Sequence, residues 1–91
     1  MTVRITPEAV DVIRRSLELA NADPKEMAVR LRGAGGAIRP RFVTEGEPTD
    51  VLVEAEGIRV FLAADLVDGD VEIAVTPEHE TLTVRPLTSD T

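Results

Sequence analysis

Hydrophobic and polar residues alternate in several short runs along this chain, a pattern that predicts paired β-strands. The clearest run lies between residues 27 and 43, where apolar side chains occupy every second position on both sides of Gly33–Gly36. Two such runs separated by a short glycine-rich segment are typical of a β-hairpin. We therefore predict two strands here, joined by a loop of these four residues.

The length of that loop determines which residues of the hairpin face each other. A four-residue loop gathers the apolar side chains on one face of the hairpin and places Arg30 opposite Arg39 on the other. Arg32 and Arg41 lie beside this pair. Like charges directly opposite each other destabilise a sheet, by up to ~1 kcal/mol per pair. The hairpin therefore needs compensation, which acids on a neighbouring strand, a bound anion or a partner would provide.

One helix and two further hairpins are predicted in the rest of the chain. Thr6 and Pro7 are favourable at the start of a helix, and apolar residues then follow at spacings of three and four. Glu56-Gly57 is a favourable turn between two strand patterns. The predicted elements are a strand at 2–5, a helix from 7 to about 20, hairpins over 51–62 and 71–86, and a helical turn at 63–67.

Charge is balanced across the second and third hairpins but not across the first. The predicted registers place Glu54 opposite Arg59 and Glu72 opposite Arg85, whereas arginine faces arginine in the first hairpin. The chain has 17 acidic and 10 basic residues and a formal net charge of -7, so acids are abundant. Because the first hairpin nevertheless leaves its arginines facing each other, it is the place to look for a functional site, although compensation by acids on a neighbouring strand is the favoured single explanation.

Together these elements predict an α+β fold, with the N-terminal helix packed on a mainly antiparallel β-sandwich or flattened barrel built from hairpins. The length is enough for one domain and not two. We expect that domain over residues 1–91, ordered from about 2 to 86 and followed by a tail at 87–91. The apolar positions of the predicted inner faces should form the core: Val10, Ile13, Leu17, Val29, Leu31, Val53, Val60, Ile73 and Val84.

The composition excludes several classes of function. The chain contains no cysteine, which removes disulfides, thiolate metal sites and thiol nucleophiles. Its acidic balance argues against nucleic-acid binding, and its two aromatic residues, Phe42 and Phe61, are too few to stack bases. No apolar run approaches the ~20 residues that span a bilayer, and no signal-peptide pattern follows Met1. We expect a cytoplasmic protein with neither membrane nor nucleic acid among its partners.

The glycine-rich loop is a candidate for binding a small anion. Backbone N–H groups of Gly33, Gly35 and Gly36 would point at the anion, and the flanking arginines would add positive charge. The sequence lacks the Gly-Lys-Ser/Thr of a Walker loop, and a strand pattern follows where a dinucleotide fingerprint needs a helix. A plain turn is therefore the favoured interpretation, with the anion site as the alternative.

Two other groups of polar residues are better explained by structure than by chemistry. Asp65, Asp68 and Asp70 lie at a predicted turn, but a calcium loop needs more ligands and a terminal glutamate at the proper spacing. His79, the only histidine, lies between two glutamates in a predicted surface turn, and the two serines fall on the helix and in the tail. No catalytic triad can be assembled, so we expect neither a metal site nor an enzyme.

The order of these motifs resembles the HesB-like family of A-type iron–sulfur carriers, the IscA group. Three stretches carry the resemblance, ITPEAVDVI, VRLRGAGGAIRPRF and DVLVEAEGIRVFLAADLVDGDVEI, and it reaches from Ile5 to about Pro86. The resemblance implies a small β-sandwich-like barrel of hairpins with a helix across it, commonly as a dimer. It also implies a role near the assembly of iron–sulfur clusters.

The ligands of that family are missing from this chain. Its members hold iron or a cluster on three cysteines, one in a glycine-rich loop and two in a Cys-Gly-Cys motif near the C-terminus. The first position corresponds to Ala34, and the other two would fall beyond Val84, where the chain reads Arg85-Pro86-Leu87. Alanine has no donor atom, and clusters require soft thiolates. The resemblance therefore supports the fold, and we expect no cofactor.

We predict a non-catalytic, cluster-free relative of these carriers that acts as a protein-interaction module, with a protein partner or a second copy as its ligand. Two alternatives stay open. One is a protein that binds a small anion or ligand through the arginine-rich hairpin, and the other is an atypical carrier whose cluster ligands come from a partner. The residues expected to bind are Arg30, Arg32, Gly33, Gly35, Gly36, Arg39 and Arg41.

Overall fold

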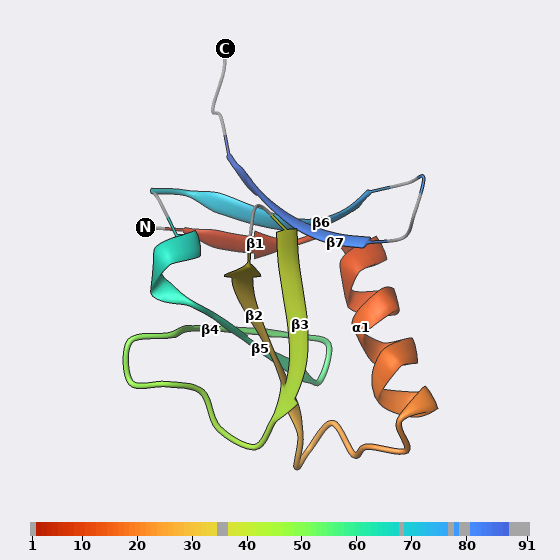
Figure 1. Cartoon of the computed structure of the whole chain (residues 1–91). Helices are drawn as coiled ribbons and strands as arrows, with labels where there is room; N and C mark the ends of the chain where they lie inside the picture. The colour runs from red at the N-terminus through yellow and green to blue at the C-terminus, as the bar shows by residue number, and fades with distance from the viewer. Residues whose placement is uncertain (1, 35–36, 68, 77, 79–80, 88–91) are drawn as a thin grey trace.

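The computed structural model describes residues 2–34, 37–67, 69–76, 78 and 81–87 and contains one α-helix and seven strands within them (Figure 1). None of its helices is long and apolar enough, within these residues, to cross a membrane. The elements in chain order are β1 (Val3–Ile5), α1 (Pro7–Leu19), β2 (Ala28–Ala34), β3 (Ala37–Val43), β4 (Val51–Ala55), β5 (Ile58–Leu62), the single 3₁₀ turn η1 (Ala64–Leu66), β6 (Val71–Thr76) and β7 (Thr81–Pro86).

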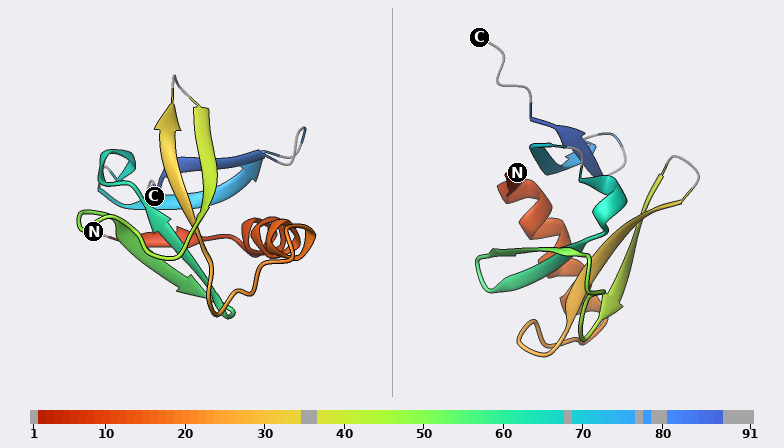
Figure 2. Two further views of the ribbon diagram at one scale, coloured as in Figure 1. Left: turned by 60° about the horizontal axis from the view of Figure 1, so that its bottom comes forward. Right: turned by 90° about the vertical axis from the view of Figure 1, so that its left-hand side faces the viewer.

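The strands form two mixed sheets that run across one another (Figures 1 and 2). One sheet has the order β1-β6-β7 and the other the order β3-β2-β5-β4. Helix α1 contacts β6 of the first sheet and β5 of the second, so it closes the space between them. The predicted α+β class is confirmed. The parallel pairings of β1 with β6 and of β2 with β5 were not predicted, because hairpin patterns report only antiparallel neighbours.

Helix α1 begins as its sequence predicts. The Thr6 Oγ1 atom accepts a hydrogen bond from the Ala9 backbone N–H at 3.1 Å, and Pro7 occupies the first turn, where its missing N–H costs no hydrogen bond. The apolar stripe is buried from Ala9 to Leu17. The helix ends before Ala20, which is exposed, because Asn21 adopts a left-handed backbone with φ of 55°.

The second and third hairpins have the predicted registers. Glu56 and Gly57 have positive φ values of 48° and 85°, the combination that a two-residue type I′ turn requires. The backbone carbonyl of Glu56 also accepts a hydrogen bond from Arg14 Nη2 at 2.8 Å, which ties this turn to α1. In the third hairpin the predicted charge pair forms, with Arg85 Nη2 2.7 Å from Glu72 Oε1.

The register predicted for the first hairpin is wrong by two residues. Strand β2 continues through Gly33 to Ala34, which pairs with Ala37, so two residues connect the strands where four were expected. Arg30 consequently lies opposite Arg41, and Arg32 lies opposite Arg39. A shift of two residues keeps every side chain on its predicted face, because side chains alternate with a period of two.

The core lies between the two sheets and α1. Seven of the nine predicted core residues are buried, and the two exceptions, Val53 and Val84, are only partly buried. Both exceptions lie on edge strands, β4 and β7, whose outer sides have no neighbouring strand among the described residues. Their position at the edges of the sheets explains why their burial is incomplete.

Truncation of a core side chain should test this assignment. Ile13 is 1% exposed, so Ile13→Ala should lower the free energy of unfolding by about 2–5 kcal/mol through lost burial and an unfilled cavity. Leu19→Ala on the same helix is the matched control, because Leu19 is 89% exposed, and its effect should stay within about 0.5 kcal/mol. Urea unfolding followed by circular dichroism measures both, and similar losses for the two variants would mean that the buried face of α1 is misassigned.

Candidate functional site

The candidate site is the arginine face, which we define as the outer face of the β2–β3 hairpin carrying Arg30, Arg32, Arg39 and Arg41. The direct pairs Arg30–Arg41 and Arg32–Arg39 bring these four guanidinium groups onto one side of the sheet. The alternate positions point inward, where Val29 and Leu31 are buried. The predicted face is therefore present, although the arginines pair in a different register.

Arg30 is compensated within the molecule by Asp50. Its Nε lies 2.7 Å from Asp50 Oδ2 and its Nη2 lies 3.0 Å from Asp50 Oδ1, which is a two-pronged ion pair. The side chain of Asp50 is only 1% exposed, while that of Arg30 is 21% exposed. Asp50 Oδ2 also accepts a hydrogen bond from the backbone N–H of Glu47 at 2.7 Å. The buried carboxylate therefore has a partner on both oxygens.

These hydrogen bonds are reflected in the acid–base properties of the pair. The hydrogen bond from Arg30 holds the pKa of the Asp50 carboxyl below its ordinary value, although burial acts in the opposite direction. The same bond raises the pKa of Arg30, and the negative charges of Glu47 and Asp65 add to that effect. Both groups are thus charged at neutral pH, and Arg30 lies in a locally acidic environment.

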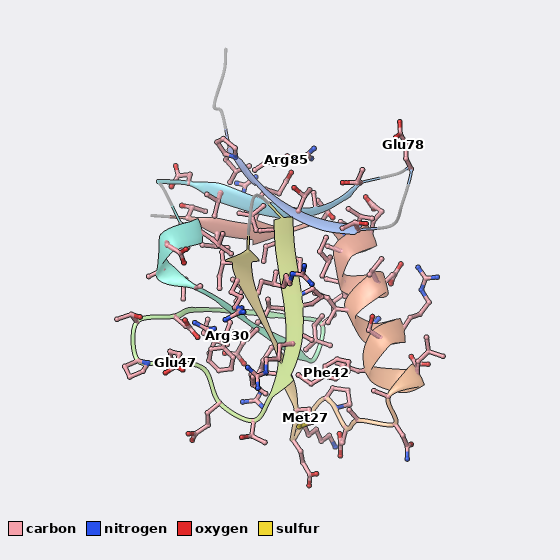
Figure 3. The ribbon with its side chains drawn as sticks, viewed as in Figure 1. Met27, Arg30, Phe42, Glu47, Glu78 and Arg85 are labelled. Atoms are coloured by element: carbon pink, nitrogen blue, oxygen red, sulfur yellow. The ribbon has the colours of Figure 1, made fainter. Side chains whose placement is uncertain are left out.

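Asp50 reaches Arg30 because the segment 44–50 crosses the outer face of the four-stranded sheet. It leaves β3 at one edge of that sheet and enters β4 at the other edge. On the way Gly46 lies against the ring of Phe61, where an added Cβ would overlap the ring carbon Cδ1. Figure 3 shows Arg30 directed towards the part of this segment that carries Glu47. The segment therefore covers the part of the outer face where Arg30 of β2 lies beside Phe61 of β5.

Sequence reasoning sought compensation on neighbouring strands and did not identify Asp50. The relevant signal was an acidic segment joining two strands that turn out to lie at opposite edges of one sheet. Such a segment must cross a face of the sheet, and its carboxylates then come close to whatever charges that face carries. The strand order needed for this inference depends on the parallel β2–β5 pair, which the hairpin patterns do not show.

The other three arginines of the face differ from Arg30. Arg32, Arg39 and Arg41 are exposed, and no ion pair or side-chain hydrogen bond of theirs is found within the described part of the chain. Strand β3, which carries two of them, is an edge strand. The structure therefore brings all four predicted arginines together, but it separates a partly buried, ion-paired one from three solvent-facing ones.

The predicted anion cradle is placed differently from the expectation. Gly33 belongs to β2 and is paired with Ile38, so it is not a loop residue. A Cβ added at Gly33 would lie 3.2 Å from Leu66 Cδ2, which shows that η1 packs against this position. Gly35 and Gly36 lie outside the described residues. The prediction that Gly33 belongs to an anion-binding loop is therefore wrong, because strand β2 extends further than the sequence indicated.

The predicted turn at Asp70 has a structural role. Its Oδ1 accepts a hydrogen bond from the Thr2 backbone N–H at 2.7 Å, and its backbone carbonyl accepts one from Leu87 at 2.8 Å. These bonds tie both ends of the described chain to the start of β6. Asp65, considered with Asp70 as a metal ligand, lies in η1, and Asp68 and His79 lie outside the described residues.

The donors for an iron–sulfur cluster do not fit this chain. Cluster iron requires thiolates, and the sequence contains no cysteine. Ala34, at the position that the family resemblance assigns to the first cysteine, ends β2 opposite Ala37. Within the described residues no group of three or more His, Cys, Asp or Glu side chains is placed to hold a metal ion. Cluster chemistry of the family's kind therefore has no protein ligands here.

The fold is that of the A-type iron–sulfur carriers. Escherichia coli SufA, a protein involved in the biosynthesis of iron–sulfur clusters, aligns with a TM-score of 0.65 at 22% identity over 94% of this chain and 86% of SufA. IscA with its [2Fe–2S] cluster aligns with a TM-score of 0.57 at 19% identity over 93% of this chain and 85% of IscA. A protein from Aquifex aeolicus gives a TM-score of 0.66 at 20% identity over 96% and 93%.

No protein-family model and no curated protein matches the sequence. At these identities the structural likeness establishes the shared fold, while function has to be argued from the residues of this chain. The resemblance read from the sequence motifs is thus confirmed for the architecture. It includes an N-terminal helix and hairpins of the expected order.

The ion pair of Asp50 gives a testable dependence on pH. A carboxyl whose pKa is lowered by folding stabilises the native state above its unfolded pKa of ~3.9, and this contribution is lost as the pH falls through the lower folded value. Asp50→Asn should therefore lower Tm by several degrees at neutral pH, with a difference from wild type that shrinks below about pH 4. Glu45→Gln, an exposed change in the same segment, is the control and should leave Tm nearly unchanged. An Asp50→Asn deficit that stays constant down to low pH would contradict the assignment.

Proposed function

We propose that this chain is a non-catalytic, cluster-free module with the A-type carrier fold that works by binding an acidic protein through Arg32, Arg39 and Arg41. The observation that carries the proposal is the contrast within the arginine face. Arg30 has a buried carboxylate partner, whereas the other three are exposed without an ion pair in the described part of the chain. A chain of net charge -7 has enough acids to pair them all, so three exposed arginines on one face that are unpaired within the described residues fit an external ligand.

The partner's chemistry follows from the face. Three guanidinium groups on neighbouring strands attract carboxylates, and charge-assisted hydrogen bonds from arginine to carboxylate are stronger than neutral ones. Such a surface steers an acidic protein during encounter and loses strength as salt screens it. By analogy with the iron–sulfur proteins that share the fold, the partner belongs to iron–sulfur cluster assembly; this step rests on the fold alone.

A small anion is the second candidate ligand of the same face. Arginine clusters also bind phosphate and carboxylate anions, and the face is open to solvent at β3. A protein partner is favoured over an anion. Of the three glycines predicted to bind an anion, Gly33 is the one within the described residues, and it lies in a strand and not in a loop of N–H groups.

The arginine face can be tested by a double variant. Arg39→Gln/Arg41→Gln removes both like-charge cross-strand pairs, so stability should be unchanged or slightly raised while association weakens. Affinity capture from native lysate should lose its acidic partner at low salt, and Tm of the purified variant should not fall. Arg4→Gln, an exposed arginine of the other sheet, is the control and should capture like wild type.

Two results would contradict this proposal. A lower Tm of the double variant at low salt, recovering at high salt, would mean that the arginines are paired within the molecule. Retained capture by a stable double variant would mean that another surface binds. Titration of the wild type with phosphate and citrate by calorimetry separates the two ligand classes, because binding of those ions at micromolar concentration would favour the anion alternative.

The absence of cluster ligands gives a second test. After anaerobic incubation with ferrous iron and sulfide, the protein should emerge from gel filtration without stoichiometric iron and without a charge-transfer band in the visible spectrum. IscA, whose structure contains a [2Fe–2S] cluster, serves as the positive control under the same conditions. Iron and sulfide that co-elute with the purified chain would overturn the cluster-free assignment.

A further inference from the structure

An apolar groove runs beside β3, on the side of the sheet that carries Ile38, Pro40 and Phe42, and Arg41 of the arginine face also lines it. It has a volume of about 340 Å³ and lies between β3 and α1, with the start of β7 at one end. Phe42, which points towards α1 in Figure 3, is 39% exposed in its wall. The side chains that matter for the following argument are Val12, Ser16, Ile38, Pro40, Phe42 and Leu82.

Strand β3 also has an edge without a hydrogen-bonded neighbour. It is the first strand of the order β3-β2-β5-β4, and no other strand within the described residues pairs with its outer edge. In a hairpin closed by two residues the pair next to the turn is hydrogen-bonded, and hydrogen-bonded pairs then alternate with non-bonded ones. Counting from Ala34–Ala37, the backbone groups of Ile38, Pro40 and Phe42 face the open edge.

Pro40 fits this arrangement. Proline has no N–H. Because an N–H at position 40 would face the open edge, its absence costs no hydrogen bond to β2. The open edge therefore offers the N–H and C=O groups of Ile38 and Phe42 and only the C=O of Pro40. An added strand can therefore form hydrogen bonds with both the N–H and the C=O at Ile38 and Phe42, but only with the C=O at Pro40.

We propose that the open edge of β3 receives an extended, acidic segment of the partner as an additional strand, with acidic residues alternating with apolar ones. The inference rests on the proposed function and specifies the partner's chemistry at the same site. Side chains of an added strand that lie beside Arg39 and Arg41 share the arginine face, where carboxylates complement them. Those that lie beside Ile38, Pro40 and Phe42 enter the apolar groove.

A second copy of this chain is a poorer occupant of that edge. If two β3 strands pair antiparallel about Pro40, Arg39 of one copy lies opposite Arg41 of the other. Like charges directly opposite are unfavourable, and this arrangement would place two such pairs beside the two that the hairpin already contains. The charges of β3 thus discriminate against self-association and in favour of an acidic strand.

A labelled peptide of about eight residues that alternates Val with Glu is the probe, a length that matches an ordinary strand. Its binding to the whole chain, followed by fluorescence anisotropy at low salt, should be saturable and should weaken at high salt. A peptide of the same composition with all Val residues before all Glu residues should bind at least about tenfold more weakly, because it cannot place its apolar and acidic side chains on opposite faces.

Variants separate the two faces of the added strand. Arg39→Gln/Arg41→Gln and Phe42→Ala should each weaken binding of the alternating peptide by about tenfold. The control for the first variant is Arg4→Gln. The control for the second is Leu52→Ala, because Leu52 is an equally prominent apolar residue, 45% exposed, on the opposite edge strand β4. Both controls should bind like wild type.

Backbone pairing is tested by methylating alternate amide nitrogens of the peptide. Only one of the two alternate sets faces β3 in an added strand, so methylation of one set should abolish binding and methylation of the other should spare it. Equal effects of the two sets, or dimerisation of the chain through β3, would overturn the inference. If the peptide does not bind at all while arginine-dependent capture of a partner persists, strand addition is wrong and the proposed function stands. Loss of both would overturn both.

Discussion

The ion pair between Arg30 and the buried carboxylate of Asp50 determines what the outer face of the four-stranded sheet can do. A carboxylate that is 1% exposed is stable there only because the guanidinium of Arg30 and the N–H of Glu47 replace the water that it loses. The pair fixes the segment 44–50 across the sheet and allows Gly46 to rest on the Phe61 ring. Sheet order, segment path and charge balance thus depend on one another, and removal of either partner would leave a poorly solvated charge.

The same ion pair divides the arginine face into two parts. Arg30 is held under the crossing segment, close to the negative charges of Asp50, Glu47 and Asp65, and is not free for an external ligand. Arg39 and Arg41 lie on the edge strand β3, beyond the cover that this segment gives to the inner strands. Arg30 and the exposed arginines of β3 are therefore neighbours in one register, but among the described residues only Arg30 of these has an ion-pair partner.

Local sequence signals predicted most of the elements and only part of the site. Thr6 at the helix start and Glu56-Gly57 at a turn act within a few residues, so their patterns were sufficient. The register predicted for the first hairpin was wrong by two residues because pairing continues through Gly33 and Ala34, residue types that are uncommon in strands, and a shift of two residues leaves the faces unchanged. Asp50 was missed because its contact spans twenty positions and depends on a parallel strand pair with no local signature.

Strand β3 has an exposed edge, and it carries residues that counter the aggregation such an edge would otherwise favour. An open edge beside an apolar groove invites pairing with any extended chain, and edge strands commonly carry charges or proline to prevent it. Here Pro40 removes one donor from the edge, and Arg39 and Arg41 repel a second copy. Neither feature repels an acidic strand. An edge with these residues would disfavour a second copy and accept an acidic strand, which is the recognition proposed above for a fold that lacks cluster ligands.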